Sequence, residues 1–211
     1  MSDYDIYAFD LDGTLLDTLD DLKSGVNAAL SAFLLPPITR EETRAFLGNG
    51  AFLLMERAAK RGENTDVPRL VEKFKEEYKK CFSKFTRVYD GVLEMLQRLK
   101  KAKKRTAVVS NKPDALVKEL CEKYFGNLIE IAIGENEAGG DRKKPAPDGV
   151  KRAIQSLGGG KAVYIGDSDV DVQTAKNAGI DCISVSWGFR ERAFLLEHGA
   201  TKIVDKAEEI F

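Results

Sequence analysis

The chain of 211 residues is poor in cysteine and histidine, the residues that most often carry redox chemistry and zinc sites. Its three cysteines, Cys81, Cys121 and Cys182, are widely scattered and form no C-x-x-C pair, and His198 is its single histidine. This usage argues against a disulfide framework and against a zinc site. Any chemistry must therefore rely mainly on carboxylates, lysines and hydroxyl groups.

Long apolar runs and an excess of one charge are also absent. No stretch approaches the roughly 18 apolar residues that a membrane span requires, and the first residues lack the basic and apolar regions of a secretory signal. The formal net charge is −1, so nothing favours a nucleic acid as partner. With 43% hydrophobic and 32% charged residues, the composition is that of a soluble globular protein. We expect a cytoplasmic protein that binds neither membranes nor nucleic acids.

The order of strand-like and helical segments predicts an α/β fold. Residues 6–9 form a short apolar run, residues 16–87 show helical periodicity throughout, and strand-like and helical segments alternate thereafter. The later strand-like segments are 106–109, 128–133, 162–165, 182–185 and 203–204. Such alternation indicates a Rossmann-like, mainly parallel sheet with helices on both faces. We predict an α/β core of residues 1–15 and 88–211 with an inserted all-helical domain of residues 16–87.

Two local patterns describe the ends of helices in the insertion. Thr18, followed three residues later by Asp21, resembles a capping box, which predicts that Thr18 caps the first helix. Apolar residues from Leu70 to Phe85 recur on one helical stripe and predict one long amphipathic helix.

Polar side chains gather where the predicted strands end. They are Asp10, Asp12, Ser110, Asn111, Lys112, Lys143, Lys144, Asp167, Asp169 and Asp171. In an open α/β sheet, ligands bind beyond the carboxyl ends of the strands. Four separate crossovers are therefore expected to deliver carboxylates, a hydroxyl group and a lysine to one edge of the sheet.

Two other motifs that combine glycine with charged residues are excluded by their spacing. An EF-hand that started at Asp10 would need glycine at its sixth position and glutamate at its twelfth, where the chain has Leu15 and Asp21. A P-loop would need a glycine at position 155 and Ser or Thr after Lys161, where the chain has Gln155 and Ala162.

These residue types suit phosphoryl transfer. Oxygen ligands from Asp10 and Asp167 would bind a hard cation such as Mg²⁺, and Lys144 with Ser110 would hold phosphate oxygens. A carboxylate can act as nucleophile toward phosphorus, and a second one, Asp12, could protonate the leaving oxygen.

Four motifs, in this order, identify a resemblance. DLDGTLLDT, VVSNK, KPAPD and GDSDVDVQTAKNAG are similar to the motifs of the haloacid dehalogenase superfamily of phosphohydrolases, and the resemblance extends over essentially the whole chain. FLGNGAFLLMERA and SVSWGF look like the phosphoglycolate phosphatase branch of that superfamily.

The resemblance implies roles for the catalytic residues. Asp10 would be the nucleophile and Asp12 the general acid and base. Ser110 would bind phosphate with help from the backbone of Asn111, and Lys144 would pair with Asp10 and the phosphoryl group.

The resemblance also implies a metal site and a substrate site. Mg²⁺ would be bound by Asp10, the backbone carbonyl of Asp12, Asp167 and Asp171, the last directly or through water. The remaining substrate-binding residues would be Gly13, Thr14, Gly48, Asn49 and Gly50, the last three in a helical cap that closes over the substrate.

The expected function is Mg²⁺-dependent hydrolysis of a small phosphorylated metabolite, with 2-phosphoglycolate as the leading candidate. A phosphosugar mutase of the same fold, a pyrophosphatase or nucleotide phosphatase, and a non-catalytic binding module are the alternatives. The catalytic carboxylates do not separate hydrolase from mutase. The charged segment 134–144 departs from the commoner family pattern. The expected assembly is a monomer or a homodimer.

Overall fold

The computed structural model describes residues 4–48, 50–59, 65–135, 140 and 142–211. Of the predicted site residues, Asn49 lies outside this part of the chain. The chain divides into two compact units, one formed by residues 1–16 and 88–211 and the other by residues 17–87.

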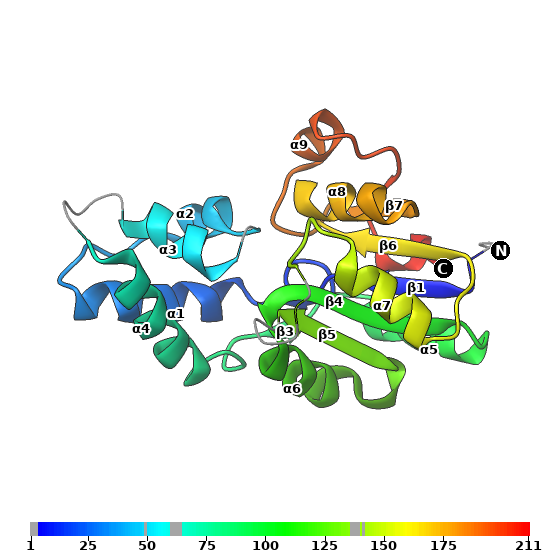
Figure 1. Ribbon diagram of the computed structural model, residues 1–211, viewed down its shortest axis with the longest axis horizontal. Coiled ribbons are helices and arrows are strands. Elements are labelled where there is room, and N and C mark those ends of the chain that lie inside the picture. Colours follow the sequence, from blue (N-terminus) through cyan, green and yellow to red (C-terminus); the bar gives the residue numbers. More distant parts are fainter. Residues whose placement is uncertain (1–3, 49, 60–64, 136–139, 141) are drawn as a thin grey trace. The chain divides into compact units, whose positions relative to one another are not determined.

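The first unit is built on a six-stranded sheet (Figure 1). The strands follow one another in the order β5-β4-β1-β6-β7-β8, and every neighbouring pair is parallel. Their bounds are β1 Ile6–Phe9, β4 Arg105–Pro113, β5 Ile131–Glu135, β6 Ala162–Gly166, β7 Asp181–Val185 and β8 Ile203–Val204. The first strand of the sequence therefore lies in the middle of the sheet, between β4 and β6.

Helices cover this sheet. They are α5 Val92–Lys101, α6 Asp114–Phe125, α7 Asp148–Ser156, α8 Asp169–Ala178 and α9 Arg192–Glu197, with 3-10 turns η1 Gly126–Leu128 and η2 Ala207–Glu209. Ala8 of β1 packs with Val150 of α7 and Ala175 of α8 in one buried cluster. The next residue back, Tyr7, points to the opposite face, where its ring contacts Phe211. Burial on both faces explains why β1 is continuously apolar.

The second unit is all helical apart from its connections. Its helices are α1 Leu19–Ala32, α2 Arg40–Phe46, α3 Ala51–Ala59 and α4 Val67–Lys79. Gly25 lets α1 and α4 approach closely, since a Cβ atom there would lie 3.0 Å from the Cβ of Tyr78. The chain enters and leaves this unit through the paired strands β2 Leu16–Asp17 and β3 Arg87–Val88.

The predicted fold class is thus confirmed. No helix within the described ranges is long and apolar enough to cross a membrane.

The two predictions about helix ends hold only in part, and the Asp21 side chain is involved in both. Thr18 occupies the N-cap position of α1, as predicted, but its side chain makes no capping hydrogen bond. Asp21 instead accepts hydrogen bonds from the backbone N–H groups of Phe85 (2.9 Å) and Thr86 (2.8 Å). Helix α4 ends at Lys79, and Phe85 is largely exposed, so the apolar stripe does not continue as one helix. The buried carboxylate fixes residues 85–86, which lead into β3.

Candidate active site

The carboxyl ends of β1 and β6 bring two predicted site residues to the same edge of the sheet. Phe9 is in register with Ile165, and the Asp10 N–H donates to the Ile165 carbonyl oxygen at 2.8 Å. Asp167 follows β6 by one residue. After β1, Gly13 adopts a left-handed conformation (φ 86°). The turn brings Thr14 back, and its hydroxyl donates to Asp167 Oδ1 at 3.2 Å.

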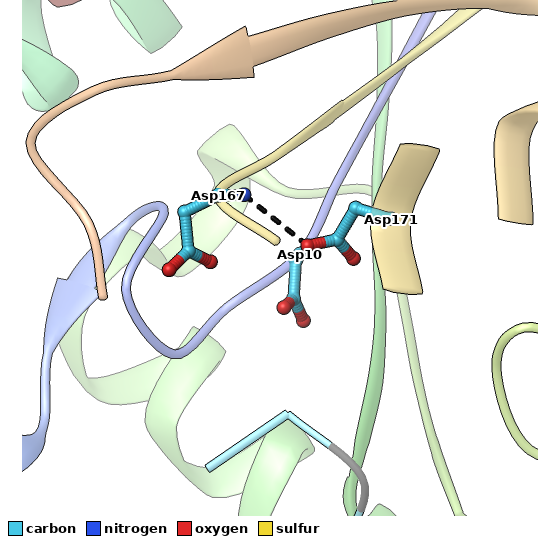
Figure 2. Close-up of side chains that lie close together, drawn as sticks. All are labelled: Asp10, Asp167 and Asp171. Atoms are coloured by element: carbon cyan, nitrogen blue, oxygen red, sulfur yellow. Dashed lines mark hydrogen bonds between the residues drawn. The ribbon is translucent and has the colours of Figure 1, made fainter. Parts of the chain in front are cut away.

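Three carboxylates form a buried cluster at this edge (Figure 2). One oxygen from each of Asp10, Asp167 and Asp171 lies within 4.8 Å of the others. Burial and, to a smaller extent, the nearby Asp171 raise the pKa of Asp10 to about 6, against the opposing effect of Lys144. Burial also raises the pKa of Asp167 well above its usual value, and Asp171 and Asp10 add to the rise. Such mutually repelling oxygen donors fit a hard divalent cation, which would compensate their charge.

Lys144 is the main countercharge of this cluster. Its ammonium group lies 2.9 Å from Asp10 Oδ1 and 2.7 Å from Asp171 Oδ1, and it donates to the hydroxyl of Tyr164 at 3.0 Å. Burial alone would lower the pKa of Lys144, but the Asp10 and Asp171 carboxylates raise it well above its usual value. The lysine therefore stays charged, with three acceptors for its three N–H groups.

The backbone around Lys144 is held by two asparagine side chains. Asn111 accepts from the Lys144 N–H at 2.8 Å and donates to the Lys144 carbonyl oxygen at 3.0 Å. Asn177 of α8 donates to the Pro145 carbonyl oxygen at 2.8 Å. The neighbouring Lys143 is half exposed and lies 3.7 Å from Glu135. The two adjacent lysines are thus clearly distinguished by their surroundings.

Asp171 uses both of its carboxylate oxygens on groups of the protein. Oδ2 accepts from the N–H groups of Asp167 (3.2 Å) and Ser168 (3.0 Å) and from the Ser168 hydroxyl (2.6 Å), while Oδ1 faces Lys144. This arrangement is a capping box at the start of α8. In this structure Asp171 fixes the start of α8 and holds Lys144, and its predicted contact with a metal stays a prediction.

Strand β4 delivers a second lysine that sequence reasoning placed at the edge without giving it a role. The pairing of β4 with β5 shifts between Val109 and Pro113, so Ser110 and Lys112 lie in a bulge and both are buried. The Lys112 ammonium lies 2.9 Å from Asp12 Oδ1 and 2.8 Å from Asp12 Oδ2. Asp12 thus faces Lys112, whereas the cluster found in the described residues consists of the other three carboxylates.

A family model described as haloacid dehalogenase-like hydrolase matches residues 7–185. The chain belongs to this family.

The similarity of this hydrolase to known proteins agrees with the family assignment. This chain is 32% identical over 210 residues to a phosphoglycolate phosphatase from Pseudomonas savastanoi pv. phaseolicola. The alignment covers 96% of this chain and 76% of the relative. The hydrolase is 36% identical to a phosphoglycolate phosphatase from Caulobacter vibrioides over 87% of this chain and 80% of that one. A crystal structure of a protein from Lactobacillus delbrueckii subsp. bulgaricus, assigned as a phosphoglycolate phosphatase, is 36% identical, with a TM-score of 0.90 over 98% and 96% of the two chains.

Residues near Gly188 complete the site of this hydrolase, and sequence reasoning did not give them a role. The Phe189 N–H donates to Asp167 Oδ2 at 2.7 Å, and Trp187 Nε1 donates to the Thr14 carbonyl oxygen at 3.0 Å. A Cβ atom on Gly188 would lie 2.5 Å from both Asp167 Oδ2 and the Gly13 carbonyl oxygen, so no side chain fits there. The SVSWGF segment contains these residues. In the sequence it indicated a branch of the family, but it did not predict their contacts with Asp167 and Thr14.

The other predicted substrate-binding residues of the hydrolase are less defined. Thr14 is buried, and its hydroxyl is engaged by Asp167. Gly48 and Gly50 belong to the second unit and flank Asn49, which lies outside the described residues. Their contact with substrate stays a prediction.

Proposed function

We propose that this hydrolase is a Mg²⁺-dependent phosphatase of small phosphomonoesters, with 2-phosphoglycolate as its leading substrate candidate. The observation that carries the proposal is the buried Asp10 carboxylate, which lies 2.9 Å from Lys144 and beside Asp167 and Asp171. A nucleophile, a cation and a set of metal donors thus converge at one sheet edge. The similarity to curated phosphoglycolate phosphatases supports this choice of substrate.

In the first half of the proposed reaction, phosphate is transferred to the protein. An oxygen of Asp10 forms a bond to phosphorus while the ester P–O bond breaks, and Asp12 gives its proton to the leaving oxygen. Lys144, Ser110 and the backbone of Asn111 stabilise the charge on the phosphoryl oxygens. Mg²⁺ held by Asp10, Asp167 and the Asp12 carbonyl, with Asp171 bound directly or through water, would offset the repulsion between Asp10 and the phosphate.

In the second half, water releases the phosphate. Asp12, now a carboxylate, accepts a proton from the attacking water, whose oxygen forms a bond to phosphorus while the aspartyl–phosphate P–O bond breaks and Asp10 is restored. We assign this chemistry to the unit of residues 1–16 and 88–211 as a catalytic core, and substrate selection and the exclusion of bulk water to residues 17–87 as a cap.

A substrate panel tests this function. We expect inorganic phosphate to be released in Mg²⁺, with the highest kcat/KM for 2-phosphoglycolate among glycolate, sugar and nucleoside phosphates and pyrophosphate, and no turnover in EDTA. Isomerised hexose phosphate without released phosphate would indicate a mutase. If pyrophosphate or a nucleotide had a higher kcat/KM than 2-phosphoglycolate, that compound would be the better substrate candidate. The absence of any turnover across the panel would support a binding module.

Asp10→Asn tests the role of the nucleophile. Because an amide cannot form the phosphorylated intermediate, we expect phosphatase activity to fall by at least about 10³-fold. Asp169→Asn is the matched control, since Asp169 begins α8 and its side chain is 35% exposed. Near-normal turnover by Asp10→Asn would refute the mechanism.

A further inference from the structure

We propose that Lys112 is a positioning residue for Asp12, and that it sets how efficiently the hydrolase expels poor leaving groups. This inference rests on the proposed function, in which Asp12 supplies the proton to the leaving oxygen. The observation behind it is the contact of one buried ammonium group with both oxygens of the Asp12 carboxylate, at 2.9 and 2.8 Å.

The contact restricts Asp12 at two points. Asp12 lies in the turn after β1, and its side chain is 19% exposed, so on its own it could adopt several rotamers. A cation that faces both oxygens fixes the direction of the carboxylate as well as its position. The Lys112 side chain is only 4% exposed, which means that its own position is also restricted. Asp12 is thereby held in one orientation before substrate arrives.

The bulge in β4 explains how Lys112 reaches Asp12. Between Val109 and Pro113 the strand contains more residues than the facing segment of β5, which runs from Ile133 to Glu135. Bulges of this kind redirect side chains. The bulge is tightly packed, because a Cβ atom on Gly134 would lie 2.6 Å from the Lys112 carbonyl oxygen. The backbone that carries Lys112 is therefore fixed by the sheet.

The two buried lysines of the site divide the carboxylates between them. Lys144 faces Asp10 and Asp171, and Lys112 faces Asp12. Asp12 is only two residues from Asp10, so an unpaired Asp12 carboxylate would be attracted toward a cation bound by Asp10 and Asp167. By holding Asp12 away from that position, Lys112 keeps it available for the leaving oxygen. Asp12 is a carboxylate while it faces Lys112, and it takes up the proton that it donates from water when substrate binds.

This role predicts a dependence on the leaving group. An aliphatic alcohol leaves poorly without a proton, whereas p-nitrophenolate leaves readily as an anion. A misplaced Asp12 should therefore slow the cleavage of an alkyl phosphate and have little effect on p-nitrophenyl phosphate. The ratio kcat/KM reports the steps through cleavage of the ester bond and excludes the later attack of water. We therefore compare kcat/KM for 2-phosphoglycolate and for p-nitrophenyl phosphate.

For Lys112→Met, we expect kcat/KM for 2-phosphoglycolate to fall by roughly 10²-fold, since an acid misplaced by about an ångström loses about that much. The value for p-nitrophenyl phosphate should fall by less than about fivefold. Lys112→Arg keeps the charge and should recover most of the loss. Lys143→Met removes the half-exposed ammonium near Glu135, and this control should change neither value. Lys112→Gln replaces Lys112→Met if the latter does not fold.

Equal losses of kcat/KM on the two substrates would overturn the proposal, because they would indicate that Lys112 binds the phosphoryl group or stabilises the fold. The absence of any loss would overturn it as well. Failure of the proposed function is seen separately, as a wild-type protein that releases no phosphate from either probe. If wild type cleaves p-nitrophenyl phosphate and spares 2-phosphoglycolate, the best alkyl phosphate of the panel takes its place in the comparison.

Discussion

One hydroxyl group links the lysine of the site to the centre of the sheet. Tyr164 lies on β6, is completely buried, and donates a hydrogen bond to the Val109 carbonyl oxygen at 2.7 Å while it accepts one from Lys144 at 3.0 Å. Burial raises the pKa of Tyr164 well above its usual value, so the phenol keeps its proton at neutral pH. The hydroxyl thus fixes the third N–H of Lys144 while the other two face carboxylates.

Tyr164→Phe removes this link without changing the shape of the ring. The variant leaves the Val109 carbonyl and one N–H of Lys144 without these partners, which should reduce the free energy of unfolding by about 1–3 kcal/mol. We expect kcat to fall about tenfold, because Lys144 becomes less well oriented. Urea unfolding and steady-state kinetics measure the two effects.

Tyr7→Phe is the control for this prediction. Tyr7 is equally buried on the adjacent strand β1, and its ring contacts Tyr4 and Phe211. Its kcat should stay near that of wild type. If Tyr164→Phe also retained the wild-type kcat, the hydroxyl would have no part in orienting Lys144.

At the scale of single residues, the sequence revealed groups near the ends of strands and missed partners that come from other segments. Asp10, Lys144 and Asp167 could be expected at one edge, because parallel strands end together and motifs follow them. Lys112 was visible in VVSNK, but its pairing with Asp12 depends on a bulge that no local pattern announces. Tyr164 looked like one more apolar residue of a buried strand.

At the scale of elements, Asp21 ties the first helix of the second unit to the segment that closes it. Its carboxylate is fully buried and accepts from the N–H of Phe85, and from the N–H and hydroxyl (2.7 Å) of Thr86. An amide side chain offers one acceptor oxygen in place of two. Asp21→Asn should therefore lower the free energy of unfolding by about 2–3 kcal/mol, which denaturant titration followed by circular dichroism can measure.

Asp20→Asn provides the contrast for that measurement. Asp20 is the preceding residue, its side chain is 43% exposed, and it pairs with Lys23 and Arg40 at 3.3 Å each. Exposed pairs of this kind contribute little, so a change within about 0.5 kcal/mol is expected. If both substitutions changed the free energy of unfolding equally, burial of Asp21 would not be the reason for its contribution to stability.

Elements themselves were predictable to different degrees. The alternation of strands and helices was sufficient for the fold, because burial on one or both faces imposes a local periodicity. Element ends were less accurate: β4 runs from 105 to 113 where 106–109 was expected, and β5 from 131 to 135 where 128–133 was expected. The segment after α4 is held by Asp21, which lies 64 residues before Phe85 in the chain. Contacts of that sequence separation leave no periodic signal.

At the scale of the whole molecule, the acidic cluster should make the stability of the metal-free protein depend on pH. The folded-state pKa of Asp10 is raised to about 6, compared with about 3.9 in an unfolded chain. Its folded state favours the protonated form, so the associated stabilisation is complete below about pH 4 and is lost as pH rises through 6. The loss is on the order of 3 kcal/mol, and Asp167 contributes in the same direction.

Thermal unfolding in EDTA between pH 4.5 and 7.5 measures this effect. We expect the Tm of the wild type to fall across this range, and added Mg²⁺ to restore it at pH 7.5 by binding the folded state. Asp10→Asn should show a shallower decline, because it lacks one of the groups that titrate. A flat Tm profile for the metal-free wild type, or no response to Mg²⁺, would contradict the picture of three buried carboxylates that one lysine compensates only in part.

The central place of β1 has a consequence for how the chain is made. Ribosomes produce Ile6–Phe9 first, but its neighbours β4 and β6 begin at residues 105 and 162. The helical unit of residues 17–87 is continuous in sequence and has all its own contacts once residue 87 has emerged. This unit can therefore fold while the apolar first strand still waits for both partners. Throughout that interval the apolar β1 segment lacks a partner on both of its edges, which makes it a segment that chaperones would protect.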